Sequence, residues 1–192
     1  MSSNMQVPVG ISNRHVHLSQ NDLEQLFGKG YELTPIKDLS QPGQYASKEL
    51  VTIVGTKGII EAVRVLGPVR TNTQVEVSKT DCFKLGIDAP VRESGDLEGS
   101  PGCVLVGPAG MVAIDKGVII AARHIHMEAE LAEELGFKDK EKVDVLVEGD
   151  REILFKNVVI RVSPKFKLEL HVDTDEANAA MLRNGAKVTV IR

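Results

Sequence analysis

Val9–Leu18 reads VGISNRHVHL, and Val118–Met127 reads VIIAARHIHM. In each stretch a largely apolar segment runs into the sequence Arg-His-x-His. A repeat in matching surroundings predicts two structural units of the same kind within one chain. The histidines of each pair are two residues apart, so on a β-strand their side chains project from the same face. The repeat therefore predicts two strands that each present a pair of imidazoles.

The segments after each Arg-His-x-His sequence also match. A helix is predicted to begin at Ser19, with Asp22 three residues on, and a second helix spans Glu128–Leu135 and ends at Gly136. Apolar alternation and turn residues predict one hairpin and one further strand in each half. These strands are Lys48–Val54 and Ile59–Leu66 around Gly55–Gly58, Lys142–Val147 and Glu152–Val162 around Glu148–Asp150, then Gln74–Ser78 and Glu169–Asp173.

These elements predict a mainly β fold with short α-helices. We expect two related β-barrel domains from an internal duplication, with the active site between them. Residues 7–87 form the first repeat and residues 118–192 the second. Residues 88–117 form a Gly- and Pro-rich connecting segment that includes strands, one of them at Cys103–Val106, and its density of turn formers argues against a helix.

Composition narrows the class of protein. The chain has 192 residues, 23 basic against 27 acidic side chains, a net charge of −4, and 42% hydrophobic residues, which is typical of a globular domain. It contains no apolar run long enough to cross a membrane, no secretory signal in Met1–Gly10 and no basic stripe for nucleic acid. Two cysteines fit a reducing compartment. We expect a cytoplasmic protein that binds neither nucleic acid nor a membrane.

When the two repeats are aligned, Glu76 and His171 occupy equivalent positions. Each histidine pair therefore gains a third candidate ligand. Three imidazole or carboxylate donors suit zinc, and three protein ligands leave one coordination position open, as in catalytic zinc sites. The predicted metal ligands are His15, His17 and Glu76 in the first set, and His124, His126 and His171 in the second. Two alternatives stay open: histidines that bind no metal, and a metal with a purely structural role.

Arginines lie close to these sets. Arg70 follows the turn Gly67-Pro-Val and precedes Glu76 by six residues, and a guanidinium can hold phosphate or carboxylate with two parallel hydrogen bonds. Arg14 and Arg123 directly precede the paired histidines, so strand alternation sends them to the opposite face. We expect ion pairs or ligand-orienting roles for them.

A cysteine nucleophile is the competing chemistry. Cys103 follows a Ser-Pro-Gly turn and could accept an acyl group. A nucleophilic thiol or hydroxyl needs a base, and no histidine remains for that purpose if all five bind metal. We therefore expect Cys103 to be a small buried residue.

Four motifs together resemble the phosphate propanoyltransferase family, the propanediol-utilisation type of phosphotransacylase found with bacterial microcompartments. The motifs are NRHVHLS at Asn13–Ser19, GPVRTNTQVE at Gly67–Glu76, RHIHM at Arg123–Met127 and HVDTDEAN at His171–Asn178. The resemblance extends from about Val7 to the C-terminus. It implies two zinc ions, coenzyme A as substrate, a homodimer, and reversible conversion of acyl-CoA and phosphate into acyl phosphate and CoA, with a short propanoyl or acetyl group.

The resemblance also implies roles for individual residues. Arg70 corresponds to the phosphate-binding, catalytic arginine. The residues that correspond to coenzyme A contacts are Ile11, Ser12, Asn13, Lys57, Arg64 and Asn178. Members that enter microcompartments have an amphipathic N-terminal helix, and Met1–Gln6 is too short and polar to form one. This departure predicts a cytosolic member or a trimmed chain.

Three functions are compatible with these features. We expect direct attack of phosphate on the thioester, because phosphate is largely dianionic near neutral pH and needs no strong base. A zinc-dependent thioester hydrolase would use the same ligands with bound water as nucleophile. A non-catalytic metal-binding module would need closed coordination.

Overall fold

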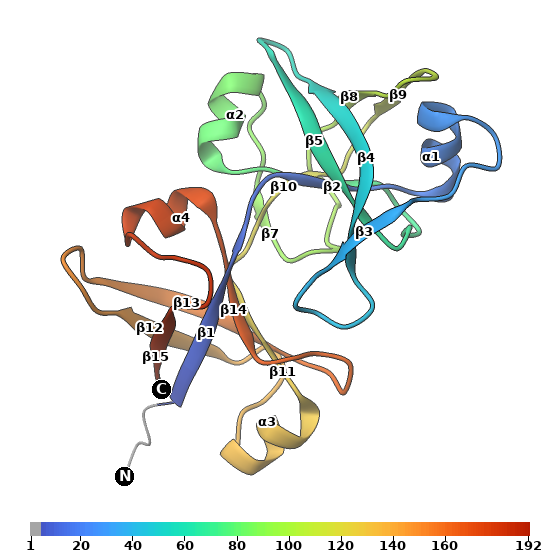
Figure 1. The fold of residues 1–192 in the computed structure, drawn as a ribbon. Coiled ribbons are helices and arrows are strands. Elements are labelled where there is room, and N and C mark those ends of the chain that lie inside the picture. Colours follow the sequence, from blue (N-terminus) through green and yellow to red (C-terminus); the bar gives the residue numbers. More distant parts are fainter. Residues whose placement is uncertain (1–4) are drawn as a thin grey trace. The chain divides into compact units, whose positions relative to one another are not determined.

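A computed structural model describes residues 5–192 (Figure 1). Contacts divide it into two compact units. We call them the barrel unit, which holds residues 5–12, 40–42 and 122–192, and the sheet unit, which holds residues 13–39 and 43–121. The expectations about a signal sequence and an encapsulation helix fall partly on residues 1–4, which lie outside the described residues.

The barrel unit is a closed six-stranded barrel with two short helices. Around the barrel the strands follow the order β1 (Met5–Ser12), β14 (Glu169–Asp173), β11 (His124–Met127), β13 (Ile153–Val162), β12 (Lys142–Val147) and β15 (Lys187–Ile191). Strand β15 pairs with β1 and closes the ring. Helix α3 (Ala129–Leu135) follows β11, and α4 (Thr174–Ala179) follows β14.

The sheet unit is a nine-stranded, curled sheet with two short helices (Figure 1). Its strand order is β7 (Val91–Arg92), β10 (Val118–Ala121), β6 (Gln74–Glu76), β2 (His15–His17), β5 (Ile59–Gly67), β4 (Tyr45–Val54), β8 (Cys103–Val106) and β9 (Met111–Ile114), with β3 (Pro35–Asp38) on β4. Helices α1 (Gln20–Phe27) and α2 (Lys79–Leu85) follow β2 and β6. The predicted mainly β fold with short helices is confirmed. Of the two predicted barrels, the one in the barrel unit is closed, whereas the sheet unit is an open, curled sheet.

The same strand arrangement surrounds the histidine pair in each unit. Strand β2 pairs antiparallel with β6 and parallel with β5, and β11 pairs antiparallel with β14 and parallel with β13. The strand just before each histidine strand, however, belongs to the other unit. Strand β1 precedes β2 but pairs with β14, and β10 precedes β11 but pairs with β6. The division into residues 7–87, 88–117 and 118–192 follows the repeats, not the contacts, and stays a prediction.

The register of these first strands matches as well. Gly10 of β1 lies opposite His171, and Ile119 of β10 lies opposite Glu76. The chain passes from one unit to the other between Ser12 and Asn13, and again between Ala121 and Ala122. Each passage lies one residue before the arginine of an Arg-His-x-His sequence. The two repeats therefore share this exchange of first strands between the units as well as the candidate ligands.

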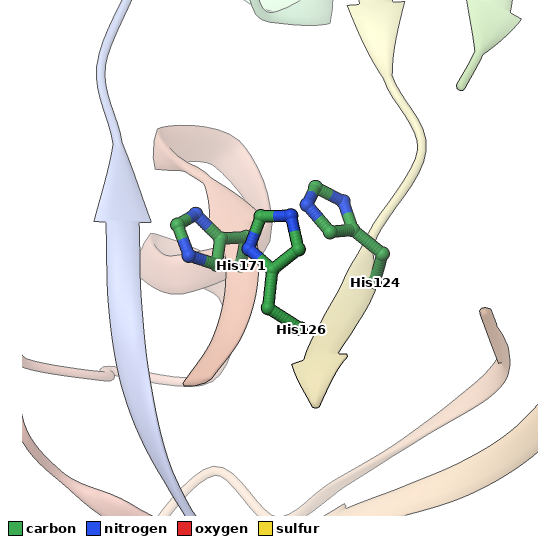
Figure 2. A group of neighbouring side chains, drawn as sticks. All are labelled: His124, His126 and His171. Atoms are coloured by element: carbon green, nitrogen blue, oxygen red, sulfur yellow. The ribbon is translucent and has the colours of Figure 1, made fainter. Parts of the chain in front are cut away.

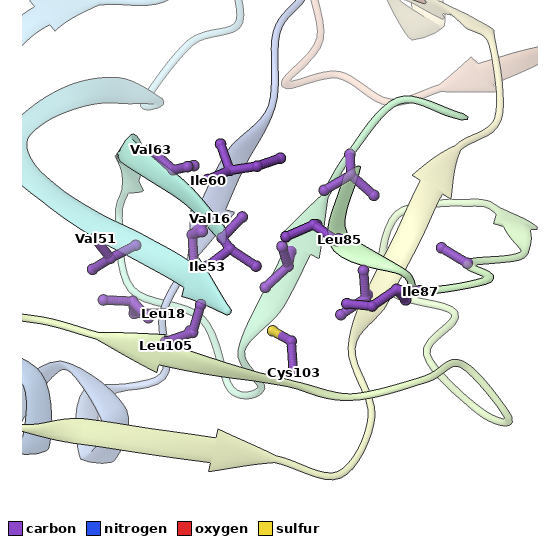
Figure 3. Packing of buried hydrophobic residues seen from close by; sticks show 14 of the residues in the cluster. Val16, Leu18, Val51, Ile53, Ile60, Val63, Leu85, Ile87, Cys103 and Leu105 are labelled. Atoms are coloured by element: carbon purple, nitrogen blue, oxygen red, sulfur yellow. The ribbon is translucent and has the colours of Figure 1, made fainter. Parts of the chain in front are cut away.

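Each unit has its own apolar core, built mostly from Val, Ile and Leu. In the sheet unit, Val16 and Leu18 pack with Ile53 and Leu105 from β4 and β8 (Figure 3). Because side chains alternate along a strand, Val16 faces this core while His15 and His17 project from the other side of β2. The core therefore fixes which face of the strand presents imidazoles.

The local signals in the sequence are largely confirmed. Ser19 caps α1 and accepts a hydrogen bond from the backbone N–H of Asp22, and α3 ends at Gly136 with a left-handed backbone. The strand predicted to continue to Ser78 ends at Glu76, because Ser78 caps α2. No helix among the described residues is long and apolar enough to span a bilayer.

We predict that Leu105→Ala destabilises the protein by about 3 kcal/mol, because Leu105 is fully buried and its truncation leaves a cavity. Leu50→Ala is the control, since Leu50 is 39% exposed on the neighbouring strand, and we expect a change below about 0.5 kcal/mol. Urea unfolding of both variants in the same buffer measures the two changes in the free energy of unfolding. Equal effects of the two variants would contradict this description of the core.

Candidate functional site

The sheet unit gathers His15, His17 and Glu76, which we call the sheet cluster. Antiparallel pairing of β2 with β6 puts His15 directly opposite Glu76. Glu76 Oε2 lies 3.3 Å from His15 Nε2, and Glu76 Oε1 lies 4.0 Å from His17 Nε2. Both histidines are buried. The predicted set is therefore brought together by a single strand pair.

The barrel unit gathers His124, His126 and His171, which we call the barrel cluster. Pairing of β11 with β14 puts His124 opposite His171. Figure 2 shows the imidazoles close together, with His124 and His126 on one strand and His171 on the next. The ring centroid of His126 lies 4.6 Å from that of His124 and 4.8 Å from that of His171. The two predicted sets thus have the same construction.

Both clusters fit a metal ion. In each, the three candidate donor atoms lie within 4.8 Å of one another. The Nδ1 atoms of His15 and His124 lie 2.8 Å from the backbone oxygens of Asn13 and Ala122. A proton held there leaves the Nε2 lone pair for an ion, as is usual for metal-binding histidines. The Nδ1 atoms of His17 and His126 are buried without a hydrogen-bond partner, which is costly unless something else contacts the ring.

The electrostatics keep the central imidazoles neutral. Burial lowers the pKa of His17 to about 3, helped by His15 and Arg70. Burial likewise lowers the pKa of His126 to about 2, helped by His124 and His171. A neutral imidazole is the form that binds metal. These two side chains therefore offer lone pairs at any physiological pH.

The carboxylate of the sheet cluster is ionised. Burial by itself would raise the pKa of Glu76, but His15, His17 and Arg70 outweigh it and hold that pKa well below its usual range. The same contact acts on His15: burial would lower its pKa, and the Glu76 carboxylate raises it instead. The cluster consequently presents an anionic oxygen beside two nitrogens, a set that hard or borderline cations prefer.

Arg70 lies beside the sheet cluster. Its backbone N–H donates to Leu18 O at 2.9 Å, which ties the turn after β5 to the end of β2. Its Nη1 donates to Ser94 Oγ at 3.0 Å, and the Ser94 hydroxyl in turn contacts Glu76 Oε1 at 3.4 Å. A guanidinium is thus joined to a candidate metal ligand through one hydroxyl.

Two polar residues of this network were not predicted. Gln74 Nε2 donates to Glu76 Oε1 at 2.6 Å and to Ser94 Oγ at 2.8 Å, and Gly95 N donates to Gln74 Oε1. Gln74 could have been found because it alternates with Glu76 on one strand face. Ser94 could not, because it lies in the turn-rich segment, where no periodicity gives a direction to a side chain.

Gln74 and Glu169 occupy the same place in the two units. Each lies two residues before the third ligand, and each is opposite the second histidine of its pair. Glu169 Oε2 lies 2.7 Å from His171 Nε2 and accepts a hydrogen bond from Ser40. The sheet cluster therefore has Glu76 beside an amide, and the barrel cluster has His171 beside a carboxylate.

Arg14 and Arg123 form ion pairs, as expected. Arg14 binds Asp81 at the start of α2, and Arg123 binds Glu176 in the first turn of α4.

The residues that correspond to coenzyme A contacts lie in both units. In the sheet unit, Lys57 is exposed at the tip of the β4–β5 hairpin, and Arg64 lies opposite His15, with Nη1 donating to Ser47 O and Lys48 O. Asn13 accepts a hydrogen bond from the backbone of Arg14. Of these, the structure brings Arg64 and Asn13 next to the sheet cluster.

The remaining three belong to the barrel unit. Ile11 and Ser12 end β1, and the backbone N–H of Ile11 donates to Asn184 Oδ1 at 2.7 Å. Asn178 is exposed on α4. Pairing puts Ile11 and Ser12 one and two residues beyond the position opposite His171. Their coenzyme role stays a prediction.

Cys103 is unsuited to nucleophilic attack. It is buried in the core of the sheet unit among the leucines and isoleucines of Figure 3, and burial raises its pKa to about 12. A thiol is a nucleophile only as thiolate.

We therefore predict that iodoacetamide modifies Cys103 in the folded protein at least about 100-fold more slowly than in urea at about pH 8. Raising the pH toward the pKa should speed the reaction, because the thiolate fraction grows. Mass spectrometry of the peptide follows the modification, and Cys82, also buried with a raised pKa, is an internal comparison. Rapid modification in the folded state would return Cys103 to the list of possible nucleophiles.

Comparison with known proteins identifies relatives along nearly the whole chain. The sequence profile of the family described as phosphate propanoyltransferase matches residues 8–183. The phosphate propanoyltransferase of Thermotoga maritima is 65% identical over 184 residues, which cover 95% of this chain and 88% of the relative. The protein of that name from Lachnoclostridium phytofermentans is 55% identical over 186 residues (96% and 87%), and that from Listeria monocytogenes is 49% identical over 186 residues (97% and 87%).

Proposed function

The chain belongs to the phosphate propanoyltransferase family and is therefore a phosphate acyltransferase. We propose that it transfers a propanoyl or acetyl group reversibly between coenzyme A and inorganic phosphate. In this proposal two zinc ions and Arg70 assist the transfer. The observation that carries the proposal is the position of Arg70, whose guanidinium is joined through Ser94 to Glu76 of the sheet cluster. An anion-binding fork beside a metal-ligand set suits a reaction whose nucleophile is phosphate.

The two clusters are the proposed zinc sites. His15, His17 and Glu76 would hold one ion, and the three imidazoles of the barrel cluster would hold the other. Bound zinc supplies Lewis acidity toward a thioester carbonyl and a soft contact for a departing thiolate. Three protein donors per site leave a position for substrate, which is the arrangement of catalytic zinc.

The protein's own groups have an electrostatic task. A phosphate oxygen forms a bond to the thioester carbonyl carbon, the carbon–sulfur bond breaks, and coenzyme A leaves as thiolate. Phosphate attacks as the dianion, so the step requires no strong base. Arg70 binds the phosphate with two parallel hydrogen bonds, offsets its charge and orients one oxygen for attack. Ser94 and Gln74 hold the guanidinium and Glu76 in place. No acyl-enzyme is formed.

We predict that Arg70→Ala lowers kcat/KM for phosphate by about 100-fold or more, because the anion loses its only proposed arginine clamp. The kcat/KM of Arg70→Lys for phosphate should lie between those of the unmodified protein and Arg70→Ala, since an ammonium keeps the charge but cannot form two parallel hydrogen bonds. Zinc content should stay that of the unmodified protein. Arg92→Ala is the matched control, because Arg92 pairs with Asp96 on the surface of the same unit. Unchanged phosphate kinetics in Arg70→Ala would exclude the clamp.

We predict two zinc ions per chain, and one in each of the variants His15→Ala and His124→Ala, because each variant removes a donor from one cluster. Chelation should abolish acyl transfer, and added zinc should restore it. Elemental analysis and the assay are done on the same samples. Full activity of a metal-free sample would defeat the zinc part of the proposal while leaving the family assignment intact.

An assay without phosphate distinguishes a thioester hydrolase from the proposed acyltransferase. A hydrolase would release CoA from propanoyl-CoA in phosphate-free buffer, whereas the proposed enzyme needs phosphate and makes acyl phosphate. The homodimer, the six coenzyme contacts and the cytosolic location implied by the resemblance remain part of the proposal, and gel filtration with light scattering tests the first of them.

A further inference from the structure

Arg14 and Arg123 make equivalent contacts in the two units. Arg14 Nε lies 2.8 and 2.9 Å from the two carboxylate oxygens of Asp81, and its Nη2 lies 2.8 Å from Oδ1. Arg123 Nη1 lies 2.7 Å from Glu176 Oε1, and its Nε and Nη2 donate to the backbone oxygen of Lys156. Each arginine directly precedes the first histidine of its pair and forms an ion pair with an acidic side chain far along the sequence.

The two carboxylates have the same place at the start of a helix. Asp81 is the third residue of α2 and closes a capping box with Ser78, and Glu176 is the third residue of α4 and closes one with Asp173. Ser78 lies two residues after Glu76, and Asp173 lies two residues after His171. Each capping box is thus fixed to the strand that provides the third metal ligand.

The strands that these contacts join are short. Strands β2 and β6 have three residues each, so few backbone hydrogen bonds define their register. A shift by one residue would turn the ligands to the other face of the sheet. An ion pair between the start of the histidine strand and the helix after the third-ligand strand opposes such a shift, and Asp81 makes its contact while buried.

We infer that Arg14 with Asp81, and Arg123 with Glu176, are two separate positioning pairs, each of which sets the geometry of the metal cluster in its own unit. The inference rests on the proposed function, because it needs clusters that bind zinc. Neither arginine is a ligand. Each acts through the histidine that follows it and the helix that follows the third ligand, so its loss should weaken one zinc site and spare the other.

The test measures each site by itself. His124→Ala impairs the barrel cluster, and His15→Ala impairs the sheet cluster. Into each background we introduce either Arg14→Gln with Asp81→Asn, or Arg123→Gln with Glu176→Gln. Replacing both partners avoids a buried unpaired charge, and the amide oxygen that Asp81→Asn introduces can still accept the capping hydrogen bond. Zinc affinity is measured by competition with a chromophoric chelator, and cobalt absorption reports ligand geometry.

The expected result is a crossover. In His124→Ala, the Arg14–Asp81 double change should lower zinc affinity by about 10- to 100-fold and alter the cobalt spectrum, while the Arg123–Glu176 change leaves both within about twofold. In His15→Ala, the Arg123–Glu176 double change should lower zinc affinity and alter the cobalt spectrum, and the Arg14–Asp81 double change should leave both within about twofold. Arg14→Lys should give an intermediate loss, since lysine keeps the charge but cannot form the fork.

The controls are two surface ion pairs. Lys79→Gln breaks an exposed pair with Asp88 in the sheet unit, and Arg192→Gln breaks one with Glu141 in the barrel unit. Neither should change zinc affinity. Equal losses at both sites, or no loss at either, would overturn the inference and leave the zinc proposal standing. Unmodified protein that binds no zinc would overturn both.

Discussion

One antiparallel pairing, made twice, brings together the two sets of candidate metal ligands in this protein. His15 lies opposite Glu76 on β2 and β6, and His124 lies opposite His171 on β11 and β14. Each pairing brings a carboxylate or imidazole from a distant part of the sequence to a histidine pair whose spacing already aligns its two rings. The cores behind the strands, the capped helices after them and the arginines before them all keep this pairing in one register.

The sequence was sufficient to predict this part of the structure because the information is local and repeated. Two residues of spacing define a face, and aligning two copies identifies Glu76 and His171 as equivalent. The exchange of first strands could not be predicted in the same way. Val9–Ser12 and Val118–Ala121 are apolar strands in either pairing, and nothing in their side chains distinguishes a neighbouring strand from one far along the chain. Ser94 was not predicted for a related reason. It lies in a turn, where the alternation of side chains along a strand does not indicate which way a side chain points.

The two clusters differ in where their negative charge lies. In the sheet cluster the carboxylate of Glu76 is at the ligand position and the amide of Gln74 is two residues before it. In the barrel cluster the imidazole of His171 is at the ligand position and the carboxylate of Glu169 is two residues before it. Each cluster thus has one carboxylate, which is itself a proposed ligand in the sheet cluster and contacts a proposed ligand histidine in the barrel cluster. Carboxylates close to a metal increase ligand basicity, so the two ions would meet different donor strengths at similar total charge.

The exchange of β1 and β10 also constrains how such a chain can be cut and how it could have arisen. A fragment that starts at Ala122 would lack β1, and the facing edges of β14 and β15 would expose unpaired backbone groups. Two copies of a half-length ancestor, each lending its first strand to the other, would have satisfied those edges as a swapped homodimer. Fusion of the two genes would then turn an intermolecular exchange into the intramolecular one seen today, and would free each half to acquire its own ligand set.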